Sequence, residues 1–284
     1  MNLPDHREEM SITTENFRKF RDYFYARTGI HFDDNKRYFV DKRLVERINA
    51  TGSRDFADYF SMLLFSQSAE LQLLVNLMTT NETYFFREEY QLKCLVNSLL
   101  PEVARRKKQG SSIRIWSIPS SSGEEPYSVA LYLLEHWPDV DAYDIELFAS
   151  DIDTHVLALA KRGVYQKRAL QYVSQGMLDK YFIRLDDGGY QIIENIRESV
   201  SFDRVNITEP AETSGYRDFD IVFCRNLLIY FDELSRREAA ETLYDTLAPE
   251  GFICLGHSES MSRISTLFHP RKFPDGIVYQ KSSS

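Results

Sequence analysis

Two neighbouring glutamates, Glu124 and Glu125, follow a small-residue turn in the run IRIWSIPSSSGEEPYSVALYLLEHW, residues 113–137. The apolar first part of this run predicts a buried strand, and the proline, serines and glycine that follow predict a loop. Apolar residues then recur at helical spacing, which predicts a helix. We expect this helix to begin at Pro126, where a missing N–H is harmless, so that both glutamates stand in the loop and can face a ligand.

A strand, a small-residue turn and a helix form the ligand cradle of open α/β sheets, in which ligands bind outside the carboxyl ends of the strands. A dinucleotide site brings pyrophosphate against bare N–H groups and uses several glycines for close approach. This turn has one glycine, Gly123, and its two glutamates would repel phosphate and attract a cation. S-adenosylmethionine carries a sulfonium and an ammonium but no phosphate. The turn therefore favours S-adenosylmethionine over a dinucleotide.

A capping box formed by Ser122 and Glu125 is the alternative, because acidic side chains also favour a helix N-terminus. It would place Pro126 at the fourth helical position, where a backbone donor is needed for the first intrahelical bond. The proline therefore favours ligand contact for the glutamates.

Further polar side chains stand at the ends of other expected strands. The segment IELFASDID, residues 145–153, ends in Asp151 and Asp153. An acid at the end of the second strand of such a unit accepts hydrogen bonds from ribose hydroxyls, which is the role we expect for Asp151. For Asp153 we prefer the N-cap of the next helix. Arg225 and Asn226 close a later apolar strand, at the edge of the sheet where the site is expected.

The elements that must position these side chains fall into two parts. Residues 13–80 show only helical periodicity, which predicts a small bundle of a size able to fold alone. The expected helices are one that ends at Gly29, followed by residues 35–50, 56–65 and 69–78. From residue 92 onward a helix at 92–108 precedes alternating strands and helices, which indicates an α/β fold. The expected strands cover residues 113–118, 145–153, 199–207, 219–226 and 276–281, with one more inside 247–261.

The expected domains are a helical domain over residues 1–78, a linker over 79–91 and an α/β domain over 92–284. Strand-forming residues flank the turn Asp187-Gly188-Gly189, which predicts a hairpin over 182–193. This hairpin interrupts the α/β alternation, so we place a small β-subdomain at about 182–203, with ESVSF as a candidate third strand.

The linker over residues 79–91 combines threonines, an asparagine, two adjacent phenylalanines and Arg87, unlike a flexible Gly/Ser linker. A connector of this kind is packed, and connectors next to an α/β domain often line the ligand site. The alternative is a packed linker whose Arg87 pairs at the surface.

The second expected helix contrasts with the acidic chain. Lys36, Arg43 and Arg47 fall close together on its surface, beside the apolar line Val40, Leu44, Ile48. Such a charged face is usually a solvated surface. The functional alternative is a docking stripe for an acidic partner helix.

Composition narrows the class of protein. A net charge of −9 argues against general binding to nucleic acid, because such binding needs a basic footprint. The three cysteines and six histidines show no metal-ligand spacing, so we expect no metal. We find no signal peptide and no apolar run long enough to insert in a membrane, and therefore expect a cytoplasmic protein.

With these stretches in view, the chain resembles the bacterial chemotaxis-receptor methyltransferases of the CheR type. Five segments carry the resemblance, in order, between about residues 79 and 260: TTNETYFFRE, WSIPSSSGEEPYS, FASDID, VFCRNLLIYF and GHSES. The resemblance covers nearly the whole chain, since the family also begins with a helical bundle. It implies an α/β fold in which that bundle precedes a Rossmann-like methyltransferase domain with a mostly parallel sheet and a small antiparallel β-subdomain.

The resemblance implies that S-adenosylmethionine donates a methyl group to a glutamate side chain in the cytoplasmic helical region of a chemoreceptor. The products would be a γ-glutamyl methyl ester and S-adenosylhomocysteine, with the enzyme recruited to receptor arrays. The carried-over donor-binding residues are Asn81, Thr83, Arg87, Glu125, Asp151, Asn206, Ile207, Arg225 and Asn226. Arg87 and Tyr230 would orient the reactants, with no general base. The receptor-docking residues would be Lys36, Arg43 and Arg47.

Two departures from the family pattern stand out. Pro119-Ser120 replaces a Gly-Cys pair found in many members, which alters the turn without removing a charge. The turn of the 182–193 hairpin is short, whereas members that tether to a C-terminal receptor pentapeptide have a longer loop there. We therefore expect this protein to act independently of that pentapeptide.

Two rival functions stay open at this point. One is a catalytically silent S-adenosylmethionine-binding signalling adaptor. The other is a nucleic-acid methyltransferase, which the negative net charge disfavours, as does the absence of an Asn/Asp-Pro-Pro-aromatic tetrad after the strand that ends at Asn226.

Overall fold

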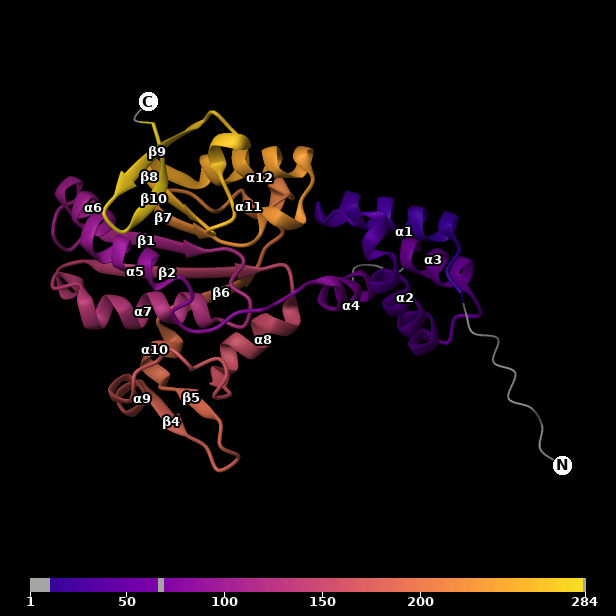
Figure 1. The fold of residues 1–284 in the computed structure, drawn as a ribbon, viewed down its shortest axis with the longest axis horizontal. Coiled ribbons are helices and arrows are strands. Elements are labelled where there is room, and N and C mark those ends of the chain that lie inside the picture. Colours follow the sequence, from indigo (N-terminus) through magenta and orange to yellow (C-terminus); the bar gives the residue numbers. More distant parts are fainter. Residues whose placement is uncertain (1–10, 66–68, 283–284) are drawn as a thin grey trace. The chain divides into compact units, whose positions relative to one another are not determined.

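The computed structural model describes residues 11–65 and 69–282 of the 284-residue chain. These residues form two compact units, divided between Thr80 and Asn81 (Figure 1). Each unit is described by itself.

Within its described residues, the first unit is built from helices alone. Thr13 caps α1 by accepting the N–H of Asn16 at 3.1 Å, and Gly29 ends it with a left-handed φ of 71°. The helices are α1 (Thr14–Thr28), the short 3-10 helix η1 (Asp34–Lys36), α2 (Arg37–Thr51), α3 (Phe56–Phe65) and α4 (Ala69–Met78). This confirms the four helices expected from the sequence.

The described part of the second unit contains a seven-stranded sheet in the order β6-β2-β1-β7-β8-β10-β9. Neighbouring strands from β6 to β8 run parallel, while β10 is antiparallel to both β8 and β9. The strands are β1 (Ser112–Ser117), β2 (Asp144–Asp151), β6 (Val200–Arg204), β7 (Phe219–Cys224), β8 (Leu247–Leu255), β9 (Phe268–Phe273) and β10 (Gly276–Lys281). Every residue of β7 is buried, as its near-continuous apolar sequence predicts for a central parallel strand.

The strand order reverses between β1 and β7. From β1 the chain proceeds to β2 and β6 on one side, whereas β7 and β8 lie on the other. Ser117 at the end of β1 pairs with Ala149 of β2 and with Phe223 of β7. The carboxyl ends of these three strands therefore meet at one edge, which is where open α/β sheets bind ligands.

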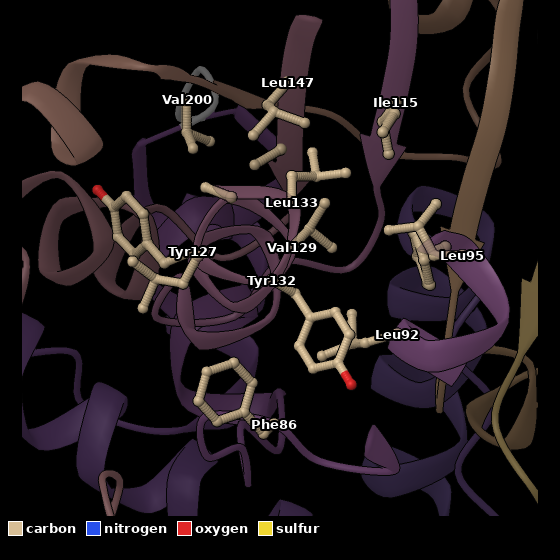
Figure 2. Packing of buried hydrophobic residues seen from close by; sticks show 14 of the residues in the cluster. Phe86, Leu92, Leu95, Ile115, Tyr127, Val129, Tyr132, Leu133, Leu147 and Val200 are labelled. Atoms are coloured by element: carbon tan, nitrogen blue, oxygen red, sulfur yellow. The ribbon is translucent and has the colours of Figure 1, made fainter. Parts of the chain in front are cut away.

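Helices of the second unit pack on this sheet. Leu133 of α7 (Glu124–His136) points toward Leu147 of β2 (Figure 2), while the Tyr127 ring packs against Phe202 of β6 with centroids 5.5 Å apart. The other helical segments are α5 (Glu89–Cys94), the π-helical η2 (Leu95–Leu99), α6 (Leu100–Arg106), η3 (Val140–Ala142), α8 (Thr154–Arg162), α9 (Gln175–Tyr181), α10 (Glu194–Glu198), α11 (Pro210–Thr213), η4 (Leu228–Tyr230), α12 (Glu233–Thr246) and η5 (Met261–Arg263). None of the helices in the described residues is long and apolar enough to cross a membrane.

A small antiparallel sheet of order β3-β5-β4 lies outside the main sheet. Its strands are β3 (Val164–Tyr165), β4 (Phe182–Arg184) and β5 (Tyr190–Ile192), so the expected hairpin is confirmed. Its third strand is β3 rather than ESVSF, of which Glu198 ends α10 and residues 200–202 belong to β6 beside β2. The expected extent of 182–203 is wrong at both ends. It begins too late, because β3 belongs to the small sheet, and it ends too late, because the buried Val200 and Phe202 belong to the main sheet.

Candidate functional site

The turn after β1 is tighter than expected. Helix α7 begins at Glu124 and not at Pro126, so the expectation that both glutamates lie in the loop is wrong. Its first intrahelical bond runs from the N–H of Tyr127 to the Gly123 carbonyl at 3.1 Å. Pro126 is the third helical residue, and an N–H there has no partner inside the helix in any case.

The two glutamates of the first turn differ in their surroundings. Glu124 is 4% exposed and accepts the Ser122 hydroxyl at 2.8 Å, while its burial raises its pKa. The Ser122 hydroxyl therefore binds Glu124, whereas the capping box considered from the sequence would have joined Ser122 to Glu125. Glu125 instead reaches the end of β7.

Gly123 suits this turn because of its backbone conformation and its close neighbours. Its φ is 92°, which side chains rarely adopt. A Cβ at this position would lie 3.0 Å from the Ala160 Cβ and 3.1 Å from the Tyr165 hydroxyl. The turn is therefore clamped between α7 and α8.

Arg225 joins three segments at the end of β7. Its Nη1 donates to Glu125 Oε2 at 2.8 Å, and its Nη2 lies 3.3 Å from Glu88 Oε2. Nη2 also donates to the Arg87 carbonyl at 2.6 Å. The Arg225 side chain is 4% exposed, so this triad is a buried ion cluster in which two carboxylates share one cation. It fixes the linker segment beside β1 and β7.

The cluster sets the pKa of its two acids in opposite directions. Burial raises the pKa of Glu125, although Arg225 opposes the change. Burial also acts to raise the pKa of Glu88, but Arg225 and hydrogen bonds from His257 and Tyr90 outweigh it, so that pKa is lowered. His257 Nδ1 lies 3.0 Å from Glu88 Oε1.

Two buried polar atoms of this cluster have no hydrogen-bond partner among the described residues. They are Glu125 Oε1 and Arg225 Nε. Buried polar atoms are nearly always satisfied, so each is a place where a ligand with matching groups gains a hydrogen bond. An acceptor next to a donor suits a ligand that carries both an ammonium and a carboxylate.

Asp151 is the last residue of β2 and is 3% exposed. Its Oδ2 accepts the N–H of Ser121 at 2.8 Å, and its Oδ1 accepts the N–H of Asp153 at 2.9 Å. Burial raises the pKa of Asp151 to about 6, against the opposing effect of these N–H groups. The Ile152 N–H is a third backbone donor to this carboxylate, so part of its acceptor capacity remains for a ligand hydroxyl.

The linker is connected to Asp151 through Asp153, which is hydrogen-bonded to both. Asp153 caps α8 by accepting the N–H of His155 at 2.8 Å, which confirms the expected N-cap. Its other oxygen accepts Asn81 Nδ2 at 2.8 Å. Further along the linker, Thr83 is half-buried, and Arg87 donates from Nη1 to the Glu82 carbonyl at 2.9 Å.

The loop after β7 is held by a residue from the loop after β8. Glu259 accepts the N–H groups of Asn226 and Leu228, each at 2.8 Å, and that of Gly256 at 2.9 Å. Tyr230 ends the turn η4 that follows, and its side chain is 38% exposed. Asn226 is therefore tied to the site edge, with Tyr230 accessible beside it.

Four of the six non-glycine residues with left-handed φ values lie at this edge: Phe86 (60°), Glu88 (55°), Ser121 (47°) and Asn226 (60°). The other two, Asp218 before β7 and Glu250 early in β8, lie away from it. Such conformations cost of the order of 1–3 kcal/mol each at non-glycine residues and cluster at functional sites. Their presence in the linker and in the loops after β1 and β7 supports a shared site.

Asn206 and Ile207 follow β6, the strand next to β2, and both are buried. The Asn206 N–H donates to Glu212 Oε2 at 2.7 Å, and its Oδ1 accepts the Thr208 hydroxyl at 2.9 Å. The adjacent Val205 N–H donates to the Asp151 carbonyl at 3.1 Å, which joins this loop to the site.

The expected docking residues have mixed surroundings: Lys36 ends η1 directly before α2, and Arg43 and Arg47 lie on α2. Lys36 is exposed, and Arg43 donates from Nε to the Leu77 carbonyl of α4 at 2.5 Å. Arg47 forms two hydrogen bonds with Glu70, at 2.9 and 2.7 Å, and its side chain is 18% exposed. Two of the three residues therefore also hold the helical bundle together.

Sequence reasoning assigned no role to Glu88, Ser121 or Glu259, which the structure places at the site. Glu88 and Glu259 lie inside the segments TTNETYFFRE and GHSES, which were the only signal available for them. Within residues 11–65 and 69–282, no group of three His, Cys, Asp or Glu side chains could hold a metal ion.

Comparisons with known proteins agree with this arrangement. A family model described as "CheR methyltransferase, SAM binding domain" matches residues 81–277, and one described as "CheR methyltransferase, all-alpha domain" matches residues 15–79. "Chemotaxis protein methyltransferase 2" of Vibrio cholerae is 51% identical over 96% of this chain and 95% of its own. A protein of the same name from Pseudomonas aeruginosa is 37% identical (92% and 91% covered), and "Chemotaxis protein methyltransferase" of Salmonella typhimurium is 36% identical (93% and 90% covered). The chain belongs to the CheR methyltransferase family and carries its S-adenosylmethionine-binding domain.

Proposed function

We propose that the protein transfers a methyl group from S-adenosylmethionine to glutamate side chains in the cytoplasmic helical region of chemoreceptors, where it is recruited to receptor arrays. The product is a γ-glutamyl methyl ester. The names of the relatives support the chemotaxis role. One structural observation carries the donor assignment: the carboxylates of Glu125, Glu88 and Asp151 gather at the carboxyl ends of the central strands, where a phosphate-binding site would offer bare N–H groups.

Asp151 and Glu125 account for the two ends of the donor. The Asp151 carboxylate accepts from the ribose of the donor, in the manner of acids at the end of the second strand. The unsatisfied Oε1 of Glu125 accepts from the ammonium group of the methionine part. Arg225 holds Glu125 in place and so contributes to donor binding as a positioning residue.

The remaining proposed donor contacts come from the loops around these two acids. Asn81 and Thr83 border the donor from the linker, and Arg87 pairs with the donor carboxylate. Support for this role of Arg87 is that its guanidinium uses Nη1 for the Glu82 carbonyl, which leaves its other N–H groups available. Asn206 with Ile207 borders the adenine, and Asn226 borders the donor from the loop after β7.

The chemistry requires little from the protein beyond alignment. When bound, the donor supplies a methyl group that its sulfonium has already activated. The acceptor glutamate has an ordinary pKa of about 4.3 and is ionised at neutral pH, so no general base is needed. Tyr230 stands exposed beside Asn226 and orients the acceptor carboxylate, while proximity supplies much of the acceleration. Burial of the reacting carboxylate removes its water shell.

Receptor docking is proposed for the basic face formed by Lys36 of η1 with Arg43 and Arg47 of α2. Lys36 is exposed, whereas the Glu70 carboxylate neutralises Arg47, so Lys36 and Arg43 make the larger contribution. We also propose that docking does not use a receptor pentapeptide. The support is the compact turn of the β4–β5 hairpin, which is closed by a 2.8 Å bond from the Leu185 N–H to the Gly189 carbonyl.

Incubation of the protein with methyl-labelled donor and receptor-containing membranes tests the function. Treatment of the labelled receptors with alkali should release methanol, because carboxyl methyl esters are alkali-labile. Label that survives alkali would point to methylation of nitrogen or carbon. Donor binding without any label on receptors would instead identify a silent signalling adaptor.

A further inference from the structure

The GHSES segment, residues 256–260, is the part of the sequence pattern to which the proposed chemistry assigns no role. It follows β8 directly and contains Glu259. The two oxygens of this carboxylate accept three backbone N–H groups, two of which belong to a different loop. A carboxylate with several backbone donors forms a strong, geometrically fixed anchor.

Each of these bonds holds a specific point of the loop after β7. Oε2 accepts from Asn226, whose left-handed φ of 60° has to be maintained by its surroundings. Oε1 accepts from Leu228, the first residue of η4, and so fixes the start of the turn that ends at Tyr230. The anchor thus determines where two proposed site residues stand.

The two loops approach closely at Gly256. A Cβ on Gly256 would lie 2.9 Å from Asn226 Nδ2 and 2.9 Å from Glu259 Oε2. It would also lie 3.1 Å from the Asn226 backbone nitrogen. Because Glu259 also accepts the Asn226 N–H, a displacement of Glu259 should affect the position of Asn226.

We propose that Glu259 is a positioning residue for methyl transfer, which acts by fixing the loop from Asn226 to Tyr230. This inference rests on the proposed function. Glu259 itself touches neither donor nor acceptor. Its contribution is the placement of the Asn226 side chain for donor binding and of the Tyr230 hydroxyl for the acceptor.

Glu259→Gln and Glu259→Asp test the anchor in the full-length chain. Glutamine replaces one acceptor oxygen by an NH₂ group that faces backbone N–H groups, and aspartate keeps the charge but withdraws both oxygens by one methylene. We expect each variant to lose about tenfold in kcat for receptor methylation and about tenfold in affinity for S-adenosylhomocysteine, because at least one N–H loses its partner. Full activity of Glu259→Asp would mean that negative charge alone matters and would overturn the proposal.

Asp220→Asn is the matched control. Asp220 is a buried carboxylate at the start of β7, where it accepts the Arg114 N–H at 2.9 Å and pairs with Lys107. It lies near the amino end of β7, whereas the loop that Glu259 holds follows the carboxyl end of that strand. We expect this variant to lose unfolding stability while the folded protein keeps its kcat. An equal loss of kcat in Asp220→Asn and Glu259→Gln would show a general effect of destabilisation and would contradict the proposal.

A double-variant cycle separates positioning from a merely structural role. If Glu259 acts through Tyr230, then Glu259→Gln should lower kcat less in a Tyr230→Phe background than in the wild type, at saturating donor and receptor. The same fold-loss in both backgrounds would overturn the inference. Failure of the wild-type protein to methylate receptors would instead refute the proposed function, and the affinity for S-adenosylhomocysteine would still report on the anchor.

Discussion

Replacement of Arg225 by methionine should destabilise the second unit strongly. The arginine is 4% exposed, and its partners Glu88 and Glu125 are 11% and 12% exposed, so the change leaves two buried carboxylates without a cation. Breaking a buried ion pair in this way costs about 3–5 kcal/mol. Loss of the hydrogen bond to the Arg87 carbonyl adds about 1 kcal/mol. The expected decrease in the free energy of unfolding is therefore about 4–6 kcal/mol at pH 7.

The effect should depend on pH in a defined direction. Without Arg225, the pKa of each carboxyl group is higher than in the wild type, because burial is no longer opposed by the guanidinium charge. The native state of the variant then binds more protons than the native state of the wild type as the pH falls toward the ordinary glutamate pKa of about 4.3, so the variant regains stability relative to the wild type. The deficit relative to the wild type should be smaller at pH 5 than at pH 7.

Tryptophan fluorescence during urea unfolding measures this free energy selectively. Both tryptophans of the chain, Trp116 and Trp137, are buried in the second unit. Arg237→Met is a suitable control, because Arg237 pairs with Glu233 in an exposed i,i+4 arrangement on α12 and should give no measurable change. A deficit below about 1 kcal/mol for Arg225→Met, or one independent of pH, would refute the reasoning, since it would be typical of a surface pair.

Three further predictions concern other parts of the chain. Affinity for S-adenosylhomocysteine should fall as the pH falls through about 6, because the pKa of Asp151 is raised to about 6 and protonation removes its negative charge. Calorimetric titration between pH 5 and pH 8 should show this step in the wild type but not in Asp151→Asn. Gly123→Ala should lower the free energy of unfolding by about 1–3 kcal/mol, measured by the same fluorescence assay, because of its φ of 92° and the 3.0 Å contact with the Ala160 Cβ; no loss would contradict the clamped turn. Arg47→Met should destabilise the first unit by about 1–3 kcal/mol, seen as an earlier loss of helical circular dichroism on heating, because Glu70 loses its bidentate partner.

The periodicity of the sequence was sufficient for most elements of the fold. The four helices of the first unit follow from apolar residues at helical spacing and from stop signals such as Gly29. The strands β1, β2 and β7 follow from short apolar runs that end in polar residues. The edge strand β9 and the helix α12 were not anticipated. In β9, the sequence FHPRKF contains a proline and alternates little, and only its pairing with β10 makes it a strand.

The start of α7 shows a limit of local rules. Pro126 correctly indicated a helix N-terminus, but proline is tolerated at each of the first helical positions, since their N–H groups have no intrahelical acceptor. The choice of Gly123 as the N-cap depends on the neighbouring Ala160 and Tyr165. Those contacts are tertiary, and no local pattern encodes them.

The ion pairs and hydrogen bonds between the loops of the site could not be predicted from the sequence for a similar reason. Arg225 was expected at the candidate site because it closes an apolar strand, and the structure places it directly after β7, where it pairs with Glu125. Its partner Glu88 lies far away in the sequence, and Glu259 binds backbone N–H groups that carry no residue-specific signal. Strand ends identify the edge of the sheet, whereas the pairing between loops depends on the assembled fold.

A crystal structure of the protein with S-adenosylhomocysteine tests the account most directly. We predict that the ribose hydroxyls lie within hydrogen-bond distance of the Asp151 carboxylate and that the ammonium group lies against Glu125. A structure in which the product binds elsewhere, with both carboxylates still unliganded, would contradict the assignment of these acids to a positively charged donor.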